Sequence, residues 1–295
     1  MAVLEQGGKP SDQGSGPLAI ICGGGSLPLA VADAVAGRGR RVVLFPVRGW
    51  ADPAAVAHYP HHWIGLAQIV RLQRLARREG CRELVFIGAV LRPSPRQLRP
   101  DLGTLRLLPR IVRLFLGGDD HLLTGLGRLF EEAGFRLLGA HQVAPEILVP
   151  AGALGRRGPS PRDLADIARG LSLISAMGSF DIGQAVVIAD NRVLAVEATE
   201  GTDHMLARVA ELRREGRIGL PKKVGVLVKA PKSGQDRRFD LPSIGVRTVA
   251  GVAAAGLAGI AVEAEGAIAA DLQDTIRAAD AAGLFVFGAR ADGSS

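Results

Sequence analysis

The chain contains few aromatic residues and little cysteine. Phe, Trp and Tyr make up 4% of its 295 residues, and they are not interleaved with the arginines. The formal charge of +7 therefore indicates a phosphate-bearing small molecule or an anionic membrane surface as partner, and no nucleic acid. Only two cysteines occur, Cys22 and Cys81, each beside an apolar run, which predicts buried free thiols and a reducing cytosol.

Long hydrophobic runs are also missing. No uninterrupted apolar segment reaches the roughly 18 residues that a membrane span requires. The closest candidate, residues 246–264, contains Arg247 and Glu263 and is better explained as a helix followed by a strand. Residues 1–16 are polar and rich in Gly and Ser, so we expect a disordered leader and no signal peptide.

Apolar strands alternate with helical patterns, which predicts an α/β fold with a parallel sheet over residues 17–150. A Pro- and Gly-rich stretch predicts a linker over residues 151–161, and a mixed α/β domain is expected over 162–295. The strands expected are 18–22, 41–45, 84–87, 135–138, 185–189, 193–198, 225–228, 260–262 and 284–287. The helices expected are 27–37, 65–79, 105–115, 122–133, 162–177, 203–215 and 272–282.

A glycine-rich turn joins the first expected strand to the first helix: Gly23, Gly24, Gly25, Ser26, Leu27 and Pro28. Such a turn aims backbone N–H groups at a phosphate. It matches the dinucleotide fingerprint G-x-G-x-x-G only in part, because Pro28 stands at the third glycine and no acidic residue ends the second strand. The motif favours a nucleotide-like ligand over NAD, and a tight turn without any ligand stays an alternative.

Two groups of carboxylates precede expected helices. Either Asp119 or Asp120 suits the N-cap of the helix near Leu122, and the other could face a ligand. The second group, Glu197, Glu200 and Asp203, could ligate Mg²⁺. Beside it, Gly201 and Thr202 could offer N–H groups to a phosphate, although Thr202 and Asp203 also suit a plain helix start.

The most charged loop follows the strand expected at 225–228. Lys229 and Lys232 can neutralise phosphate oxygens, and Pro242 stiffens the chain just after Asp240. A carboxylate held beside cations stays ionised, which suits a metal ligand or a base that orients water. An ion-paired surface loop is the alternative.

With these motifs the chain resembles the LpxI family of UDP-2,3-diacylglucosamine pyrophosphatases, from Leu18 to Gly288. The motifs that carry the resemblance are IICGGGSLPLAVA, GAVLRP, GDDHLL, GAHQV, DIGQAVVI, VLAVEATEGTDHML, GVLVKAPKSGQDRRFDLPSIG and AGLAGIAVEA.

The resemblance implies an N-terminal Rossmann-like domain, a C-terminal domain of its own type and a homodimer. It implies hydrolysis of the lipid-linked UDP-sugar to UMP and 2,3-diacylglucosamine 1-phosphate (lipid X) in lipid A synthesis. Water would attack the α-phosphorus with Mg²⁺ or Mn²⁺ present. It also implies a cytoplasmic protein peripherally associated with the inner membrane.

The family's essential aspartate, in an R-x-D-L-P motif, corresponds to Asp240, and Asp236 ranks second. Lys229 is expected to stabilise developing charge. The expected metal ligands are Asp240, Glu200, Asp203 and Glu197. The expected substrate-binding residues are Gly23, Gly24, Gly25, Leu27, Pro28, Gly88, Asp120, Gln184, Gly201, Thr202, Lys232 and Gln235. Two other hypotheses are a non-catalytic sensor of UDP-sugar lipids and an NAD(P)-dependent oxidoreductase, in which Arg48 could meet a 2′-phosphate.

Overall fold

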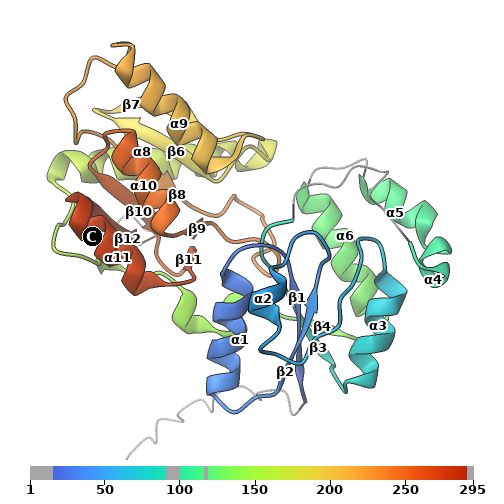
Figure 1. Cartoon of the computed structure of the whole chain (residues 1–295). Helices are drawn as coiled ribbons and strands as arrows, with labels where there is room; N and C mark the ends of the chain where they lie inside the picture. Colours follow the sequence, from blue (N-terminus) through green and yellow to red (C-terminus); the bar gives the residue numbers. More distant parts are fainter. Residues whose placement is uncertain (1–15, 91–99, 116–118, 291–295) are drawn as a thin grey trace, which may run out of the picture.

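The computed structural model describes residues 16–90, 100–115 and 119–290 and shows two α/β domains side by side (Figure 1). Residues 1–15 of the expected leader lie outside the described residues. So do residues 91–93 of the GAVLRP motif and Gly118 of the GDDHLL motif.

The N-terminal domain is built on a four-stranded sheet in the order β2-β1-β3-β4, with every neighbouring pair parallel. The parallel α/β prediction is confirmed. The strands are β1 (Leu18–Cys22), β2 (Val42–Pro46), β3 (Glu83–Ile87) and β4 (Arg136–Leu137). The helices are α1 (Leu27–Gly37), α2 (Pro53–Val56), α3 (Ile69–Arg78), α4 (Leu102–Leu105), α5 (Leu108–Phe115), α6 (Asp119–Glu131), α7 (Ala140–Val143) and the 3₁₀ helix η2 (Pro145–Ile147).

Three helix starts in this domain differ from the sequence prediction. The helix expected from residue 65 begins at Ile69, because Gly65 donates to the Gln68 side chain and Ala67 has a φ of 66°. The helix expected at 105–115 is two helices, α4 and α5. The helix expected near Leu122 begins at Asp119, so its first turn contains the acids predicted to precede it.

The C-terminal domain is built on a six-stranded mixed sheet in the order β5-β12-β10-β8-β6-β7. The mixed α/β prediction is confirmed. The strands are β5 (Gly152–Ala153), β6 (Ala185–Ala189), β7 (Arg192–Val196), β8 (Val226–Lys229), β10 (Gly259–Glu263) and β12 (Phe285–Ala289), with a separate parallel pair of β9 (Ser243–Ile244) and β11 (Ile268–Ala269). The helices are α8 (Pro161–Met177), η3 (Gly178–Phe180), α9 (Gly201–Arg214), α10 (Val246–Ala254) and α11 (Leu272–Ala282).

Helices cover both faces of this mixed sheet. Apolar residues of α8, such as Ile167 and Ile174, pack with Val186 and Val228 on one face. On the other face, side chains of α9, α10 and α11 pack together with alternate residues of β6, β8, β10 and β12. The alternation of strand side chains between two apolar layers explains why these strands are buried along their length.

Two predictions in the C-terminal domain need correction. The segment expected as a linker contributes β5, which pairs antiparallel with β12 and so belongs to the sheet. The helix expected to start at Asp203 begins at Gly201, with Glu200 at the N-cap, so Thr202 is not the cap. The hairpin prediction is confirmed: Asp190 and Asn191 have φ angles of 53° and 60°, as a tight hairpin turn requires.

The two domains share part of a core. Leu241 and Ile268, from the C-terminal half, are 8% and 4% exposed and pack in the cluster that contains Leu18, Ile20 and Ile87. The boundary between the two domains, which we call the seam, is therefore closed by apolar side chains from both halves of the chain.

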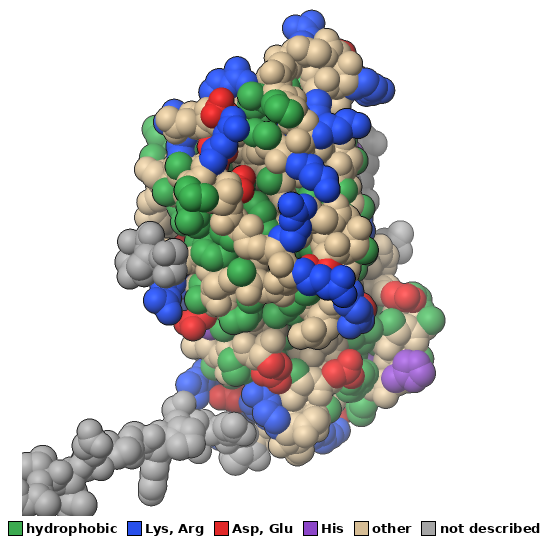
Figure 2. Space-filling view, turned by 90° about the vertical axis from the view of Figure 1, so that its left-hand side faces the viewer, with side chains coloured by type: hydrophobic (Ala, Val, Ile, Leu, Met, Phe, Trp, Pro, Cys, Tyr) green, Lys and Arg blue, Asp and Glu red, His purple; other side chains and the backbone are tan. Residues whose placement is uncertain are grey.

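Cys22 and Cys81 are buried and free, as predicted, and burial raises their pKa to about 12 and about 11. Within the described residues, none of the helices combines the length and the hydropathy that crossing a bilayer demands. On the face that Figure 2 shows, Lys and Arg side chains lie among hydrophobic ones over the C-terminal domain.

Candidate functional site

Asp240 lies where the two domains meet. The residues on either side of it anchor to the N-terminal domain: the Phe239 ring lies 5.7 Å from that of Phe86, and Leu241 joins the N-terminal core. Its carboxylate is held from the C-terminal domain, because Gln184 and Gln235 donate side-chain amide hydrogens to Oδ2, Gln235 at 2.8 Å. Among the described residues none donates to Oδ1, so one carboxylate oxygen remains available to a ligand.

A chain of hydrogen bonds connects Asp240 to a buried lysine. The Gln184 backbone N–H donates to Glu197 Oε2 at 2.8 Å, and the Thr202 hydroxyl donates to Glu197 Oε1 at 2.6 Å. Lys229 Nζ in turn donates to Thr202 Oγ1 at 3.0 Å. Gly183 allows this approach, because a Cβ there would lie 2.2 Å from the Glu197 carbonyl oxygen. Both Glu197 oxygens are therefore engaged, and Glu197 positions its neighbours.

Lys229 was expected in the charged loop, and this placement is wrong. It is the last residue of β8, 6% exposed, and its ammonium also donates to the Ser243 carbonyl at 2.9 Å. Burial lowers the pKa of Lys229, and the negative charges of Glu197, Asp240 and Asp203 oppose that shift. The result is a cation fixed beneath the seam rather than a mobile surface charge.

The loop that follows β8 orients the second amide. Lys232 donates its backbone N–H to Gln235 Oε1 at 3.0 Å, which leaves the Gln235 NH₂ group directed at Asp240. The Lys232 side chain pairs with Asp181, which lies just before Gln184. The loop and the segment before β6 are thus held together by an ion pair on one side and by Asp240 on the other.

The carboxylate of Asp236 forms an ion pair with an arginine. Its carboxylate pairs with Arg238 at 2.8 Å, and Arg238 reaches Glu131 in α6 at 2.7 Å. Hydrogen bonding to Arg238 lowers the pKa of Asp236. The three side chains link the domains, and a catalytic role for Asp236, which stays a prediction, would require Arg238 to leave it.

His141 of α7 lies near this link. Within the described part of the chain its buried Nδ1 has no hydrogen-bond partner. Burial and the charge of Arg237 lower the pKa of His141. Neither His141 nor Glu131 was predicted for the site, and no local pattern marks them, because both reach the seam only through the fold.

The other expected metal ligands lie apart. Glu200 pairs with Arg208 at 2.8 Å, and exposed Asp203 pairs with Arg247. Residues 16–90, 100–115 and 119–290 bring no three His, Cys, Asp or Glu side chains together as a metal centre. The four carboxylates predicted as one ligand set therefore do not form one cluster.

The glycine-rich turn is largely used for packing. Gly23 N–H donates to the Ile87 carbonyl at 2.9 Å and Gly24 N–H to Ala89 at 2.8 Å. Gly88 has a φ of 100°, and a Cβ on Gly23 would lie 2.6 Å from its carbonyl carbon. The two glycine turns after β1 and β3 are therefore pressed together, and Pro28 is buried against Gly88. Gly25 and Leu27, at the start of α1, remain to face a ligand.

Two further predictions concern single residues. The Asp120 backbone lies in the first turn of α6, and its side chain lies outside the described residues. Arg48, which the oxidoreductase hypothesis assigned to a 2′-phosphate, lies 5.8 Å from the centre of the Trp63 ring.

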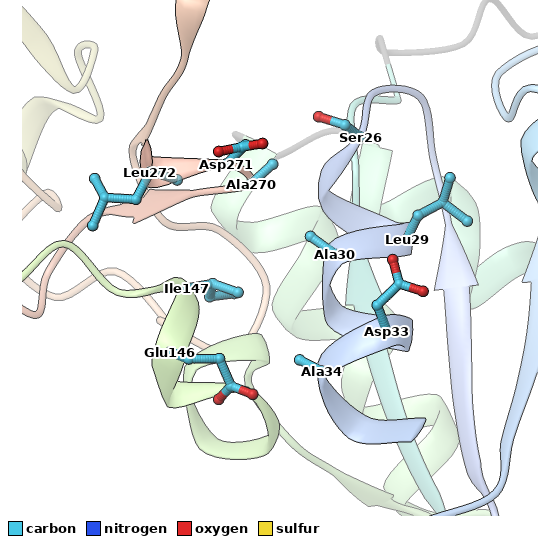
Figure 3. A pocket seen from close by; sticks show the side chains of 11 residues that line it. Ser26, Leu29, Ala30, Asp33, Ala34, Glu146, Ile147, Ala270, Asp271 and Leu272 are labelled. Carbon is cyan, nitrogen blue, oxygen red and sulfur yellow. The ribbon is translucent and has the colours of Figure 1, made fainter. Parts of the chain in front are cut away.

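A cavity of about 440 Å³ opens on the α1 side of the seam (Figure 3). Ala30 and Ala34 of α1 lie opposite Ile147, and Asp271 stands at the rim opposite Ser26. Its lining includes neither Asp240 nor Lys229, so the cavity is separate from the hydrogen-bonded chain. The full lining is Ser26, Leu29, Ala30, Asp33, Ala34, Glu146, Ile147, Ala269, Ala270, Asp271 and Leu272.

Comparison with known proteins matches both domains. The LpxI N-terminal domain family matches residues 17–147, and the LpxI C-terminal domain family matches residues 150–287. The UDP-2,3-diacylglucosamine pyrophosphatase LpxI of Caulobacter vibrioides is 42% identical over 271 residues, which cover 92% of this chain and 96% of that protein.

Solved structures show only a distant likeness. UDP-glucose 4-epimerase from Brucella ovis, in complex with NAD, matches 68% of this chain and 75% of its own with 13% identity and a TM-score of 0.27. UDP-glucose-4-epimerase from Stenotrophomonas maltophila matches 84% of this chain and 64% of its own, also with 13% identity and a TM-score of 0.27.

Proposed function

The chain belongs to the LpxI family, and from this premise we propose that it hydrolyses the pyrophosphate bond of UDP-2,3-diacylglucosamine. The products are UMP and 2,3-diacylglucosamine 1-phosphate, and the reaction is a step of lipid A synthesis. The observation that supports it most is the relative of that name, which matches almost the full length of both chains.

The geometry of Asp240 supports hydrolysis at the seam. Its oxygen Oδ2 is fixed by two amides from the C-terminal domain, and Oδ1 is available. A carboxylate fixed in this way can orient a water molecule for attack on phosphorus. In this proposal Asp240 is the catalytic residue, and Gln184 and Gln235 position it.

Lys229 supplies positive charge to the same region. Its ammonium is buried and fixed by Thr202 and Ser243, so it needs no reorganisation when negative charge develops on the phosphate oxygens. Electrostatic stabilisation of that kind is worth more in a site from which water is excluded. Lys232, on the loop, lies closer to the surface and is assigned to binding the pyrophosphate.

Mg²⁺ or Mn²⁺ is part of the proposal. Mg²⁺ is commonly held by one or two carboxylates together with substrate phosphates and water, so a preassembled cluster is not required. Asp240 is the residue that would hold it, through Oδ1. The ion would neutralise charge on the pyrophosphate oxygens. The lipid-linked substrate supports the proposed peripheral association with the inner membrane, and the proposed homodimer rests on the family resemblance alone.

The test is release of UMP from UDP-2,3-diacylglucosamine by purified protein, with Mg²⁺, with Mn²⁺ and with EDTA. We expect metal-dependent UMP, reduced at least about a hundredfold in Asp240→Asn, which keeps the shape of the side chain. Circular dichroism and a melting curve check that the variant folds.

Two outcomes would contradict the proposal. Folded wild-type protein that binds the substrate tightly but releases no UMP with any divalent ion would indicate a sensor of UDP-sugar lipids. Asp240→Asn that keeps activity within about tenfold of wild type, or roughly 1.4 kcal/mol of barrier, would remove Asp240 from the reaction.

A further inference from the structure

Helix α4 carries exposed apolar side chains. Leu102 is 86% exposed, the highest value for a large hydrophobic residue within the described part of the chain, and Leu105 is 47% exposed. A soluble surface tolerates single exposed leucines, so exposure alone indicates nothing. Leu102 and Leu105, however, are neighbours on one short helix and lie beside Arg106, Arg110 and Arg113. We call the surface that these five residues form the α4–α5 face.

The α4–α5 face is basic. Arg106, Arg110 and Arg113 are exposed, and the sequence from Leu102 to Phe115 contains no acidic residue. Arg110 pairs with Glu132 at 2.9 Å, whereas neither Arg106 nor Arg113 forms an ion pair with a described residue. The face therefore keeps a net positive charge next to its leucines.

The exposure of these leucines is built into the fold. Asp101 caps α4 by accepting from Thr104 N–H at 2.9 Å, and its other oxygen accepts from Arg71 N–H at 3.0 Å. Thr104 is fully buried and accepts from Val70 N–H at 3.1 Å. A Cβ on Gly103 would lie 2.6 Å from the Val70 side chain, so α4 lies directly against α3. With its inner side fixed in this way, α4 presents Leu102 and Leu105 outward.

The face lies at the carboxyl end of the N-terminal sheet. The chain leaves β3 at Ile87, forms α4 and α5, and returns through α6 to β4. Figure 1 shows α4 and α5 beyond α6, at the upper right of the domain. The glycine turn lies at the same end of the sheet, because Gly23 contacts Gly88 immediately after β3. Asp240 approaches this end too, because the neighbouring Phe239 ring lies 5.7 Å from that of Phe86 in β3.

We propose that the α4–α5 face docks the protein on an anionic lipid bilayer. Exposed leucines flanked by arginines insert their apolar groups at the level of the headgroups, while the arginines are attracted to anionic lipid. The biological purpose of this docking rests on the proposed function, since a lipid-borne substrate must be reached at a membrane. The binding of the α4–α5 face to a bilayer does not depend on the proposed function.

The experiment is co-sedimentation of the full chain, without substrate, with vesicles of phosphatidylethanolamine and phosphatidylglycerol or of phosphatidylcholine alone. We expect binding to the anionic vesicles that weakens as NaCl is raised, because salt screens the exposed arginines. Leu102→Asp with Leu105→Asp should lower the partition coefficient about tenfold or more. Arg106→Ala with Arg113→Ala should lower it roughly fivefold per arginine.

Matched controls lie on the C-terminal domain. Val193→Asp changes an apolar residue of β7 that is 42% exposed, and Arg214→Ala with Arg217→Ala removes two arginine side chains that are 76% and 72% exposed. These variants should bind vesicles like wild type. If they lose as much binding as the α4–α5 variants, the attraction is non-specific and the proposal fails.

Other outcomes also decide. If the leucine variant binds vesicles unchanged but shifts the sedimentation coefficient, the face is an interface between copies of the chain. If the leucine variant does not fold, the arginine variant alone decides. UMP release from detergent-dispersed substrate separates the two proposals: an inactive chain that binds vesicles contradicts only the proposed reaction, and an active chain that does not bind contradicts only the docking surface.

Discussion

The side-chain amide of Gln184 donates a hydrogen bond to the carboxylate of Asp240, although 56 residues separate them in the chain. Gln184 lies immediately before β6 of the C-terminal domain, whereas Asp240 lies between two residues that pack into the N-terminal domain. The bond therefore connects the carboxylate that we assign to catalysis with the opposite side of the seam. The strength of this hydrogen bond depends on the relative position of the two domains.

Gln184→Leu removes this donor and leaves Gln235 as the remaining one. A hydrogen bond to a charged group contributes about 1.5–3 kcal/mol, so we expect kcat to fall by roughly tenfold or more while KM changes little. A double-mutant cycle with Asp240→Asn checks the assignment. Because Gln184 acts through Asp240, its replacement should cost nothing further in the Asp240→Asn background. Additive losses would mean that Gln184 acts on the substrate directly.

Lys229→Met keeps most of the buried volume and removes the charge. Replacement of a buried ion by a well-packed apolar side chain is often neutral or stabilising, so the melting temperature should stay within a few degrees. Turnover should fall at least about tenfold, because the fixed cation no longer faces the reacting phosphate. Lys229→Arg is the matched control, because it keeps the positive charge but changes the shape of the side chain. A Met variant with full activity would leave Lys229 with a purely structural role.

The ion pair between Asp236 and Arg238 should make the free energy of unfolding depend on pH. Arg238 lowers the pKa of Asp236 below its ordinary value of 3.8, so the pair stabilises the folded state above about pH 4. That stability is lost as the pH falls through the lowered pKa. In urea unfolding between pH 2.5 and 6, wild type should lose more stability on acidification than Asp236→Asn. Arg238→Ala should show the same flattened profile, since it removes the cause of the shift. Parallel profiles for all three proteins would contradict the pairing.

Gly23→Ala tests the contact between the two glycine turns. The added methyl group would lie 2.6 Å from the Gly88 carbonyl, and backbone atoms cannot rotate away, so we expect a loss of about 1–3 kcal/mol in unfolding free energy. Gly37→Ala, at the end of α1, is the control. It meets nothing within 4 Å and should be neutral or slightly stabilising. Equal effects would show that the turns can separate at little cost.

Local signals predicted most elements. The helix at Leu272–Ala282 was placed to the residue, because Asp271 caps its start and Gly283 ends it with a φ of 65°. The hairpin at Asp190 and Asn191 was found in the same way, from side chains that tolerate positive φ. Such features need only the residues around them.

The errors in the site have a common physical origin. Thr202 is expected to bind substrate or to begin a helix, but its hydroxyl bonds to Glu197 and accepts from Lys229, the latter 27 residues away. Lys229 is expected in a loop because the apolar run ends at Val228, and only its hydrogen-bond partners make burial of this lysine acceptable. Arg238 reaches Glu131 across 107 residues of sequence. Contacts of this range are set by the fold and leave no local pattern.

The family boundary between residues 147 and 150 does not coincide with a boundary in packing. Val149 is already tied to Ala267 by a backbone hydrogen bond of 2.9 Å, and Leu241 and Ile268 complete the core of the first domain. A fragment that stopped at residue 147 would expose the apolar surface that these two side chains cover. The N-terminal half is thus completed by residues of the C-terminal half, so we expect that it does not fold as an independent module.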